Sequence, residues 1–396
     1  MEKKLHRALA EAVVGILRSV FEEGAVADRE VGRVLGAHPR WGRRDRSLVA
    51  ETVYEVVRWQ RRLEVLAGSA KWWDLAGYWW EGQGFGRPEW AEWESVDAGV
   101  RVEREAQLET QPRAVRLSLS DALDALGEAE LGSGPWEAEV QAMNRAAPVF
   151  LRVNPRRGSV ASVVAELQEL GVEVRPVDGC PSGLEVLAGK GLSPQLRSSG
   201  RFEIQDAASQ QVAPFCQVQP GHRVIDYCAG AGGKTLHLAA LMAGSGDLLA
   251  LDVQERKLEN LKARAARATV RIRTALLSPE VLTKNHGLAD RVLADAPCSG
   301  SGTLRRQADL KYRITPAKVE ALHAVQREVL DGAASLVKPG GKLIYATCSI
   351  LPSENEAQTR WFSSSNPDFV LEEERRISPA AGGWDGFYMA RWNRVK

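Results

Sequence analysis

The sequence predicts an α/β fold in which a mainly parallel β-sheet, wound by helices on both faces, follows an all-helical region and a small α/β unit. Apolar residues recur at steps of three and four from Leu5 to Leu66, which indicates amphipathic helices. Residues 148–200 alternate short strand and helix patterns. From residue 201 onward, apolar strand segments alternate with helical stretches, which is typical of a parallel sheet. We therefore expect domains at residues 1–145, 146–204 and 205–396.

The composition is that of an ordinary globular protein. With 396 residues, of which 44% are hydrophobic and 26% charged, the chain is long enough for several cores. The formal net charge of +1 means that local basic patches would have to hold any polyanion. The five cysteines form no CxxC pair and the histidines show no ligand spacing, so we expect a reduced, cytoplasmic protein without a metal site. No apolar run approaches the roughly 18 residues of a membrane span.

The helical region, residues 1–145, contains two unusual segments. Residues 38–46 read HPRWGRRDR, and the helix after them carries Arg58, Arg61 and Arg62. These cations are either solvated helix faces or a patch for phosphate groups. Residues 71–111 hold six of the chain's 12 tryptophans among glycines and acids. Their mixed acidic charge favours packing in a core or an interface over the stacking of nucleobases.

The small unit, residues 146–204, begins with PVFLRVNP, which reads as a strand and a turn. SVASVVAELQELG reads as a helix that Gly171 ends, and VEVRPV reads as a second strand. Arg152, Arg156 and Arg157 are candidates for contact with phosphate.

A glycine-rich loop, DYCAGAGGKT at residues 226–235, follows the first strand of the third domain and precedes a helix. Gly230, Gly232 and Gly233 let the backbone turn tightly and approach a ligand at the helix N-terminus. The Walker phosphate pattern fails because the spacing before Lys234 is wrong. Asp252 ends the next strand, about 20 residues further on, where an acid can take the two hydroxyls of a ribose. A nucleoside cofactor is therefore expected, although NAD would also fit and Asp252 could equally cap a helix.

Two later strands end in cysteine-containing loops. ADAPCSGSGTLRR places Asp295, Pro297 and Cys298 at the end of the fourth strand, and YATCSILPSENE places Cys348 at the matching position of the fifth. Because the carboxyl ends of parallel strands meet at one edge of a sheet, both loops are expected to open onto the same crevice. A lone buried cysteine is usually a small hydrophobe, but two at equivalent strand ends, each followed by serine, indicate chemistry.

The segments DYCAGAGGKT, ALDVQERKL, RVLADAPCSGSGTLRR, DLKYRITP, LVKPGGKLIYATCS and SENE resemble the Nop/Sun (Sun/Fmu-type) family of RNA cytosine-5 methyltransferases, of the bacterial rRNA small-subunit type. The paired PCSG and TCS motifs carry most of the resemblance, which covers residues 145–392. RRDRSLVAETVYEVVRWQRRLE also resembles the NusB-like, RNA-binding helical domain that precedes the catalytic part. The resemblance implies a Rossmann-like class I methyltransferase domain at residues 205–396. The Trp-rich segment has no place in the family pattern.

The family mechanism implies a role for each residue of the cysteine loops. Carbon 5 of cytosine is too poor a nucleophile to take a methyl group unaided, so a thiolate first adds to carbon 6. By resemblance, Cys348 is this nucleophile and Cys298 lets the methylated product leave. Asp295 would hydrogen-bond the cytosine, and Lys234 would stabilise the thiolate. The target base must be single-stranded or flipped out of its helix.

The cofactor that the resemblance implies is S-adenosyl-L-methionine. One departure from the family pattern is that the third strand, TVRIRTALLSPEV, lacks the acid that binds the adenine amine, and Ser278 or Glu280 is the candidate substitute. The residues expected to bind the cofactor are Cys228, Ala229, Gly230, Ala231, Gly232, Gly233, Lys234, Asp252, Ser278 and Asp295.

We therefore expect an S-adenosyl-L-methionine-dependent enzyme that methylates carbon 5 of cytosine in RNA, with small-subunit rRNA as its substrate. Transfer RNA is the closest alternative substrate. An RNA-binding ribosome-assembly factor with weak catalysis is an alternative of another class, and a nicotinamide oxidoreductase would leave the paired cysteines unexplained. The protein is expected to act as a monomer, with no membrane or metal as partner. The cations that follow the PCSG motif are candidates for phosphate contact or plain surface charge: Arg305, Arg306, Lys311 and Arg313.

Overall fold

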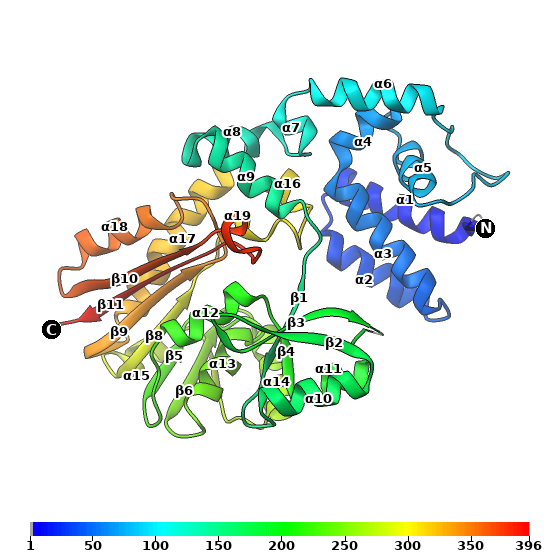
Figure 1. Ribbon diagram of the computed structural model, residues 1–396. Coiled ribbons are helices and arrows are strands. Elements are labelled where there is room, and N and C mark those ends of the chain that lie inside the picture. Colours follow the sequence, from blue (N-terminus) through cyan, green and yellow to red (C-terminus); the bar gives the residue numbers. More distant parts are fainter. Residues whose placement is uncertain (1–2, 190, 396) are drawn as a thin grey trace. The chain divides into compact units, whose positions relative to one another are not determined.

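The computed structural model describes residues 3–189 and 191–395 (Figure 1). The chain forms two compact units. One unit consists of Met1–Arg145 together with Leu304–Pro316, and the other consists of Ala146–Thr303 together with Ala317–Lys396. We call them the helical unit and the sheet unit. None of the described helices is both long and apolar enough to cross a membrane.

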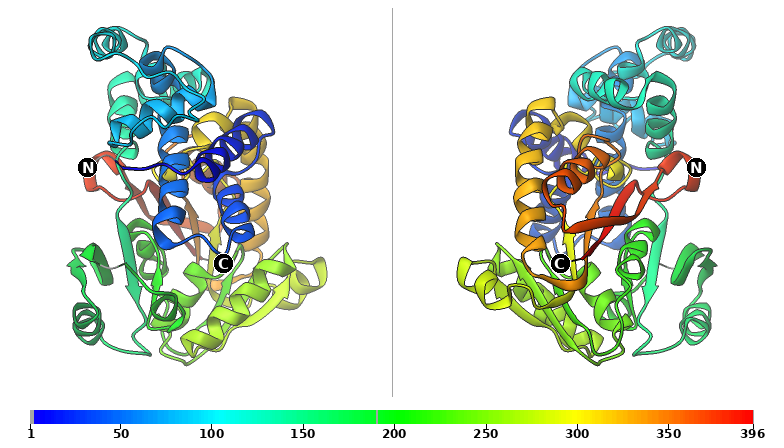
Figure 2. Two further views of the ribbon diagram at one scale, coloured as in Figure 1. Left: turned by 90° about the vertical axis from the view of Figure 1, so that its right-hand side faces the viewer. Right: turned by 90° about the vertical axis from the view of Figure 1, so that its left-hand side faces the viewer.

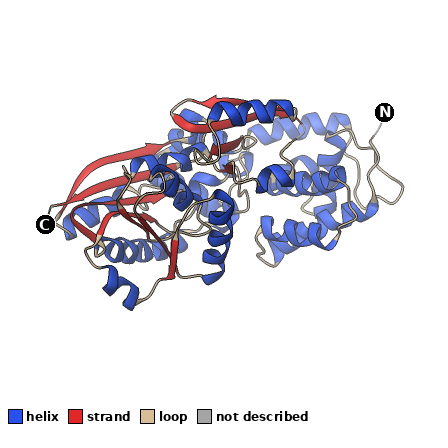
Figure 3. Cartoon of the chain, turned by 90° about the horizontal axis from the view of Figure 1, so that it is seen from below, coloured by secondary structure: helices blue, strands red, loops and turns tan. Residues whose placement is uncertain are grey.

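The helical unit consists of helices and loops (Figure 3). The three- and four-residue periodicity is confirmed in α1 (Arg7–Glu22), where Leu9, Val13 and Leu17 are buried. The other helices of the unit are α2 (Ala27–Ala37), α3 (Arg43–Arg58), α4 (Gln60–Ala67), α5 (Trp72–Gly82), α6 (Ala98–Glu109), α7 (Arg113–Arg116), α8 (Asp121–Leu131), α9 (Ser133–Met143) and α16 (Leu310–Arg313).

The Trp-rich segment contributes to the core of the helical unit. Trp80 and Trp93 are buried, with ring centroids 5.4 Å apart, and the indole of Trp80 donates to Thr52 Oγ1 at 3.0 Å. A Cβ at Gly77 would lie 2.2 Å from the ring of Trp93, so only glycine fits there. The prediction of core packing is confirmed for these two rings.

Two buried basic side chains, Arg58 and Lys311, join the segment Leu304–Pro316 to the rest of the helical unit. Arg58 Nη2 donates to the carbonyl of Arg305 at 3.0 Å, and Lys311 Nζ donates to the carbonyls of Arg58 at 2.8 Å and Leu117 at 3.2 Å. Lys311 is fully buried, and burial together with Arg58 lowers its pKa well below the usual range. The prediction that Lys311 contacts phosphate or lies on the surface was therefore wrong, because its ammonium group is enclosed by backbone carbonyls.

The sheet unit begins with a four-stranded antiparallel sheet in the order β2-β3-β1-β4. This part of the chain is drawn in green in Figure 2. Its strands are β1 (Val149–Val153), β2 (Val172–Val177), β3 (Cys180–Gly189) and β4 (Phe202–Ile204). The helix α10 (Val160–Glu169) begins where Ser159 Oγ accepts from the N–H of Ser162, and it packs Val163 and Leu167 on the sheet. The short α11 (Pro194–Ser198) precedes β4. The first two strands and α10 were predicted, whereas β3 and β4 were not.

A seven-stranded sheet in the order β10-β11-β9-β8-β5-β6-β7 forms the centre of the sheet unit. The pairs within β9-β8-β5-β6-β7 are parallel and the last two strands are antiparallel, so the prediction of a mainly parallel sheet is confirmed. The strands are β5 (Arg223–Asp226), β6 (Asp247–Asp252), β7 (Arg273–Leu276), β8 (Ala289–Asp295), β9 (Val337–Thr347), β10 (Phe369–Ile377) and β11 (Phe387–Arg394).

Helices cover both faces of the large sheet. Since successive side chains of a strand point to opposite faces, neighbouring residues of β5 pack against different helices. Val224 belongs to the cluster of Leu238 from α13 (Gly233–Leu241), whereas Ile225 belongs to the cluster of Leu330 from α17 (Pro316–Ala334) and Phe362 from α18 (Glu356–Ser365). The remaining helical elements of this unit are α12 (Ala207–Phe215), α14 (Glu255–Ala268), α15 (Pro279–Asn285), η1 (Ser301–Thr303) and α19 (Pro379–Gly382).

Candidate functional site

The glycine-rich loop joins β5 to the N-terminus of α13. Gly230 and Gly232 have φ of +55° and +88°, a region that favours glycine. A Cβ at Gly232 would lie 2.0 Å from Leu261 Cδ1, whereas one at Gly230 would meet no atom within 4 Å. The loop is therefore closed against α14 at Gly232 and open at Gly230, where a ligand has room to approach the backbone.

Asp252 is held against this loop at the carboxyl end of β6. Its Oδ2 accepts from the N–H of Gly230 at 2.9 Å, and its Oδ1 accepts from the N–H of Gln254 at 2.9 Å. The carboxylate is thus fixed in orientation at the mouth of the loop. Cys228, in the same glycine-rich loop, is half-buried. Burial raises the pKa of its thiol, so the thiol stays uncharged. A fixed acid beside an open glycine loop suits the ribose of a nucleoside cofactor.

Ser278, the candidate substitute for the third-strand acid, caps α15. Its Oγ accepts from the N–H of Val281 at 3.4 Å, and its hydroxyl also lowers the pKa of Glu280 through a hydrogen bond. Ser278 and Glu280 therefore already have hydrogen-bond partners, and the contact of either residue with an adenine stays a prediction.

The two predicted cysteines meet. Cys298 follows β8, Cys348 follows the neighbouring parallel strand β9, and their sulfur atoms lie 3.4 Å apart. The hydrogen bond with Cys348, together with burial, raises the pKa of Cys298 well above its usual range. Either sulfur can donate the hydrogen bond between them, so the two thiols are coupled at the shared edge of the sheet.

Lys234 and Asp295 form an ion pair at the same edge of the sheet. Lys234 Nζ lies 2.7 Å from Asp295 Oδ2 and 4.9 Å from the centre of the Phe387 ring. Burial lowers the pKa of Lys234, but Asp295 and, more weakly, Cys348 outweigh it, so the pKa is raised overall. The ammonium group therefore keeps its charge and its field extends to Cys348. All four predicted catalytic residues lie at carboxyl ends of strands or at the start of α13.

Glu354, which joins the two cysteine loops, was not predicted as a site residue from the sequence. Its side chain is fully buried and accepts from the N–H of Ser299 at 2.8 Å, from Ser349 Oγ at 2.6 Å and from Gln326 Nε2 at 3.0 Å. Ser299 follows Cys298 and Ser349 follows Cys348, so one carboxylate fixes the residue after each cysteine. The SENE motif contained Glu354, but no local pattern indicated these partners.

Gly302 fixes the backbone of Cys348. The N–H of Gly302 donates to the carbonyl of Cys348 at 3.0 Å, and its own carbonyl accepts from Gly386 at 2.8 Å. A Cβ at Gly302 would lie 2.3 Å from the carbonyl oxygen of Gly386, so the approach requires glycine.

Two arginines hold the carbonyls of the glycine-rich loop. Arg152 Nη1, from β1 of the small sheet, donates to the carbonyl of Gly233 at 2.7 Å, and Arg264 Nη1 donates to the carbonyl of Ala231 at 2.6 Å. Arg264 also pairs with Glu203 of the small sheet at 2.7 Å. Arg152, predicted to contact phosphate, is buried, so its partner is the loop of the large sheet instead. The small sheet therefore braces the loop.

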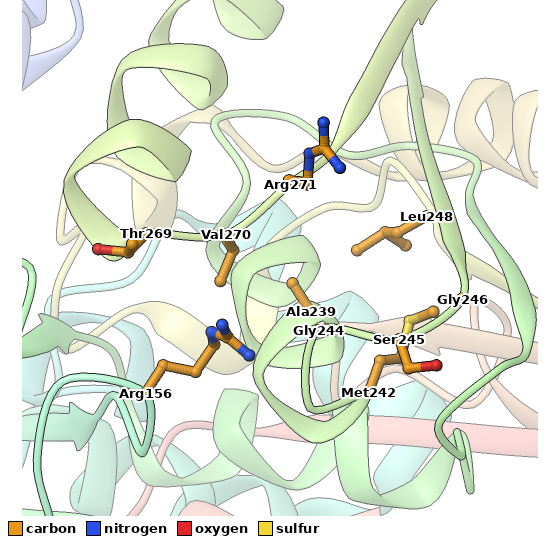
Figure 4. A pocket seen from close by; sticks show the side chains of 10 residues that line it. All are labelled: Arg156, Ala239, Met242, Gly244, Ser245, Gly246, Leu248, Thr269, Val270 and Arg271. Carbon is orange, nitrogen blue, oxygen red and sulfur yellow. The ribbon is translucent and has the colours of Figure 1, made fainter.

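A pocket of about 170 Å³ lies elsewhere in the sheet unit, and Figure 4 shows Arg156 pointing into it. It is lined by Leu248 near the start of β6 and by Arg271 before the start of β7. Asp252 and Asp295 lie at the opposite, carboxyl ends of their strands. This pocket is therefore distinct from the site of the cysteines and the glycine-rich loop. Among the described residues, no group of three or more His, Cys, Asp or Glu side chains is placed to hold a metal ion.

Comparisons with known proteins agree with this geometry. A family model described as "16S rRNA methyltransferase RsmB/F" matches residues 214–393, and one described as the ferredoxin-like domain of the RsmF/B-like methyltransferases matches residues 128–190. The chain is 36% identical over 267 residues to the probable ribosomal RNA small subunit methyltransferase B of a Synechocystis species. That alignment covers 66% of this chain and 60% of the relative, so the chain spans about 60% of the length of that relative.

Two solved structures share the fold. A methyltransferase homolog protein from Pyrococcus horikoshii aligns with a TM-score of 0.62 and 27% identity, over 73% of this chain and 99% of that one. The structure of a protein designated PH0851 aligns with a TM-score of 0.79 and 24% identity, over 99% of this chain and 100% of that one. In its fold, its paired cysteine loops and its sequence matches over residues 128–190 and 214–393, the chain is similar to the RsmB/F family of methyltransferases.

Proposed function

We propose that this chain uses S-adenosyl-L-methionine to methylate carbon 5 of a cytosine in RNA, with small-subunit rRNA as substrate, through a covalent adduct between Cys348 and carbon 6. The observation that carries the proposal is the pair of sulfur atoms 3.4 Å apart beside the Lys234–Asp295 ion pair. The relatives named as rRNA small subunit methyltransferases support the choice of substrate.

The residues at the glycine-rich loop fit the proposed cofactor. Asp252 has a fixed carboxylate for ribose hydroxyls, and the open side of Gly230 leaves room for the rest of the molecule. When bound, S-adenosyl-L-methionine supplies an electrophilic methyl group. The role of the protein is to make carbon 5 nucleophilic and to exclude water from the reacting atoms.

Cys348 begins and ends the proposed reaction. Its thiolate forms a bond to carbon 6, and the electrons of the ring double bond move to carbon 5, which takes the methyl group. Transfer of the proton on carbon 5 to solvent then returns the electrons of that bond to the ring, and the carbon–sulfur bond breaks to release Cys348 as a thiolate. In this scheme the thiol of Cys298, 3.4 Å away, donates a hydrogen bond to the departing sulfur and so speeds its release.

Asp295 and Lys234 would bind the cytosine. Asp295 Oδ2 already pairs with Lys234, while its other oxygen can accept from the exocyclic amine of the base. The ammonium group of Lys234 stabilises the thiolate before it adds. A proton of this ammonium group then passes through Asp295 to the ring nitrogen as the carbon–sulfur bond forms, and it returns when that bond breaks.

Bisulfite sequencing of total RNA from cells with and without the gene tests the proposed function. It locates 5-methylcytosine at single positions without prior choice of a substrate. We expect the loss of one signal in small-subunit rRNA. Loss in tRNA instead would preserve the chemistry and change the substrate, and no change in any RNA would overturn the proposal in favour of an RNA-binding assembly factor.

A further inference from the structure

Trp79 differs from the other five tryptophans of the Trp-rich segment. Those five have a ring partner within 6.5 Å, and three of them also donate their indole N–H to a side chain. Across residues 3–189 and 191–395, Trp79 has neither kind of partner, although one side of it packs on the core. The side chain of Trp79 is half-buried, so part of its ring surface is accessible to a ligand.

That surface lines a pocket of about 440 Å³ in the helical unit. The volume lies within the range of about 300–1,000 Å³ that small-molecule sites occupy. Two motifs left unexplained by the catalytic site meet here, the basic segment at the start of α3 and the Trp-rich segment around α5. The lining residues are Lys3, Arg43, Arg44, Ser47, Leu48, Glu51, Trp79, Gln83 and Phe85.

The pocket is basic. Arg43 and Arg44 are exposed and form no ion pair or side-chain hydrogen bond with the part of the chain that the structure describes. Lys3 Nζ lies 5.4 Å from the centre of the Phe85 ring and donates to the carbonyl of Gln83. Three cations against the single carboxylate of Glu51 leave a surplus of positive charge beside two aromatic rings.

We propose that this pocket binds an unpaired nucleotide of the RNA substrate, with its base stacked on Trp79 and its phosphate at Arg43 and Arg44. An indole face stacks on any base, and guanidinium groups neutralise the backbone, which is the combination that single-stranded nucleic acid requires. The carboxylate of Glu51, two helical turns from Arg43, suits an exocyclic amine of the base. The inference rests on the RNA methylation proposed above, because it concerns how the same substrate is held.

The test measures binding of the full chain to a fluorescently labelled, unstructured RNA of about 12 nucleotides. Loss of one stacked base predicts that Trp79→Ala weakens binding about 5- to 150-fold, whereas Trp79→Phe keeps most of the affinity. The double variant R43A/R44A is expected to lower the slope of log affinity against log salt by about 0.7 for each RNA phosphate that these arginines neutralise. Arg29→Ala removes an exposed arginine of α2 that does not line the pocket and serves as the matched control.

Methyl transfer to small-subunit rRNA is measured on the same preparations, so that the two proposals fail separately. A wild type that methylates RNA, with variants that bind as tightly as it does, would overturn the nucleotide pocket and favour a protein occupant. Weakened binding by Trp79→Ala and R43A/R44A, but not by Arg29→Ala, supports the pocket even if no methylation is found. The thermal melting of each variant shows that a loss of binding is not a loss of fold.

Discussion

At the scale of single residues, the proposed mechanism assigns different steps to Cys298 and Cys348, whose sulfur atoms lie 3.4 Å apart. We expect Cys348→Ala to abolish methyl transfer, because no other sulfur can add to carbon 6. We expect Cys298→Ala to form the adduct but release it slowly, so that RNA stays attached to the protein. Denaturing electrophoresis after incubation with rRNA and cofactor separates the two outcomes. Equal activity in both variants would sink the two-cysteine mechanism.

Glu354 acts through the cysteines rather than on the substrate, so its replacement should affect turnover and spare binding. Glu354→Gln loses an acceptor and turns an amide N–H₂ towards the donors of Ser299 or Ser349. We expect kcat to fall about 10- to 100-fold while KM for RNA stays within about twofold, because misplaced reacting groups cost this much. Glu356→Gln, whose carboxylate pairs with Arg376, is the matched control. A raised KM together with an unchanged kcat would contradict this role.

Asp226 gives the fold a pH dependence. Burial, which outweighs a hydrogen bond from Thr235, raises the pKa of this carboxyl from 3.8 to about 7. Since the folded pKa lies above the unfolded one, the carboxyl favours folding fully below about pH 4, and this contribution is lost as the pH rises through 7. Asp226→Asn should therefore gain stability relative to the wild type between pH 5 and 8, by at most about 4 kcal/mol. Urea unfolding at both pH values measures it, and a constant difference between the two proteins would refute the assignment.

At the scale of elements, the glycine-rich loop is restrained from two sides, by the side chain of Leu261 and by the guanidinium groups of Arg152 and Arg264. Gly232→Ala should destabilise the fold by about 2–4 kcal/mol, because it adds a positive-φ penalty to an overlap with Leu261. Gly287→Ala also lies at positive φ but meets no atom within 4 Å, so it should cost only the backbone penalty. Urea denaturation of the two variants compares them, and equal costs would mean that Leu261 moves aside freely.

The elements also show what the sequence could predict. Strands β5, β8 and β9 have apolar runs that end in polar motifs, so their carboxyl ends and the meeting of Cys298 with Cys348 could be predicted from period and topology. Glu354 could not be found in this way, because its hydrogen bond to Ser299 spans 55 residues and leaves no periodic signal. Strand β3 was missed because Pro181, Gly183 and Gly189 interrupt its apolar pattern, and β4 was missed because it has only three residues.

At the scale of the whole molecule, the chain does not divide once between its two compact units. It leaves the helical unit after Arg145, and Leu304–Pro316 belongs to that unit again before the chain continues with Ala317. The returning segment buries Leu304, Ala308, Ile314 and the ammonium group of Lys311. The helical unit is therefore built from two separate stretches of the chain, and no single boundary in the sequence separates it from the sheet unit.

This disagreement decides how the protein can be cut. A fragment that starts at residue 146 would keep residues 304–316 without the helices that enclose them, and each large apolar side chain so uncovered costs about 1.5–3 kcal/mol of burial. We expect such a fragment to aggregate, and a second fragment with a Gly/Ser linker of equal length in place of 304–316 to stay monodisperse in gel filtration. Equal behaviour of the two fragments would show that the returning segment is dispensable. Gene truncations planned from the order of domains alone would thus sever a folded unit that the sequence interleaves with its neighbour.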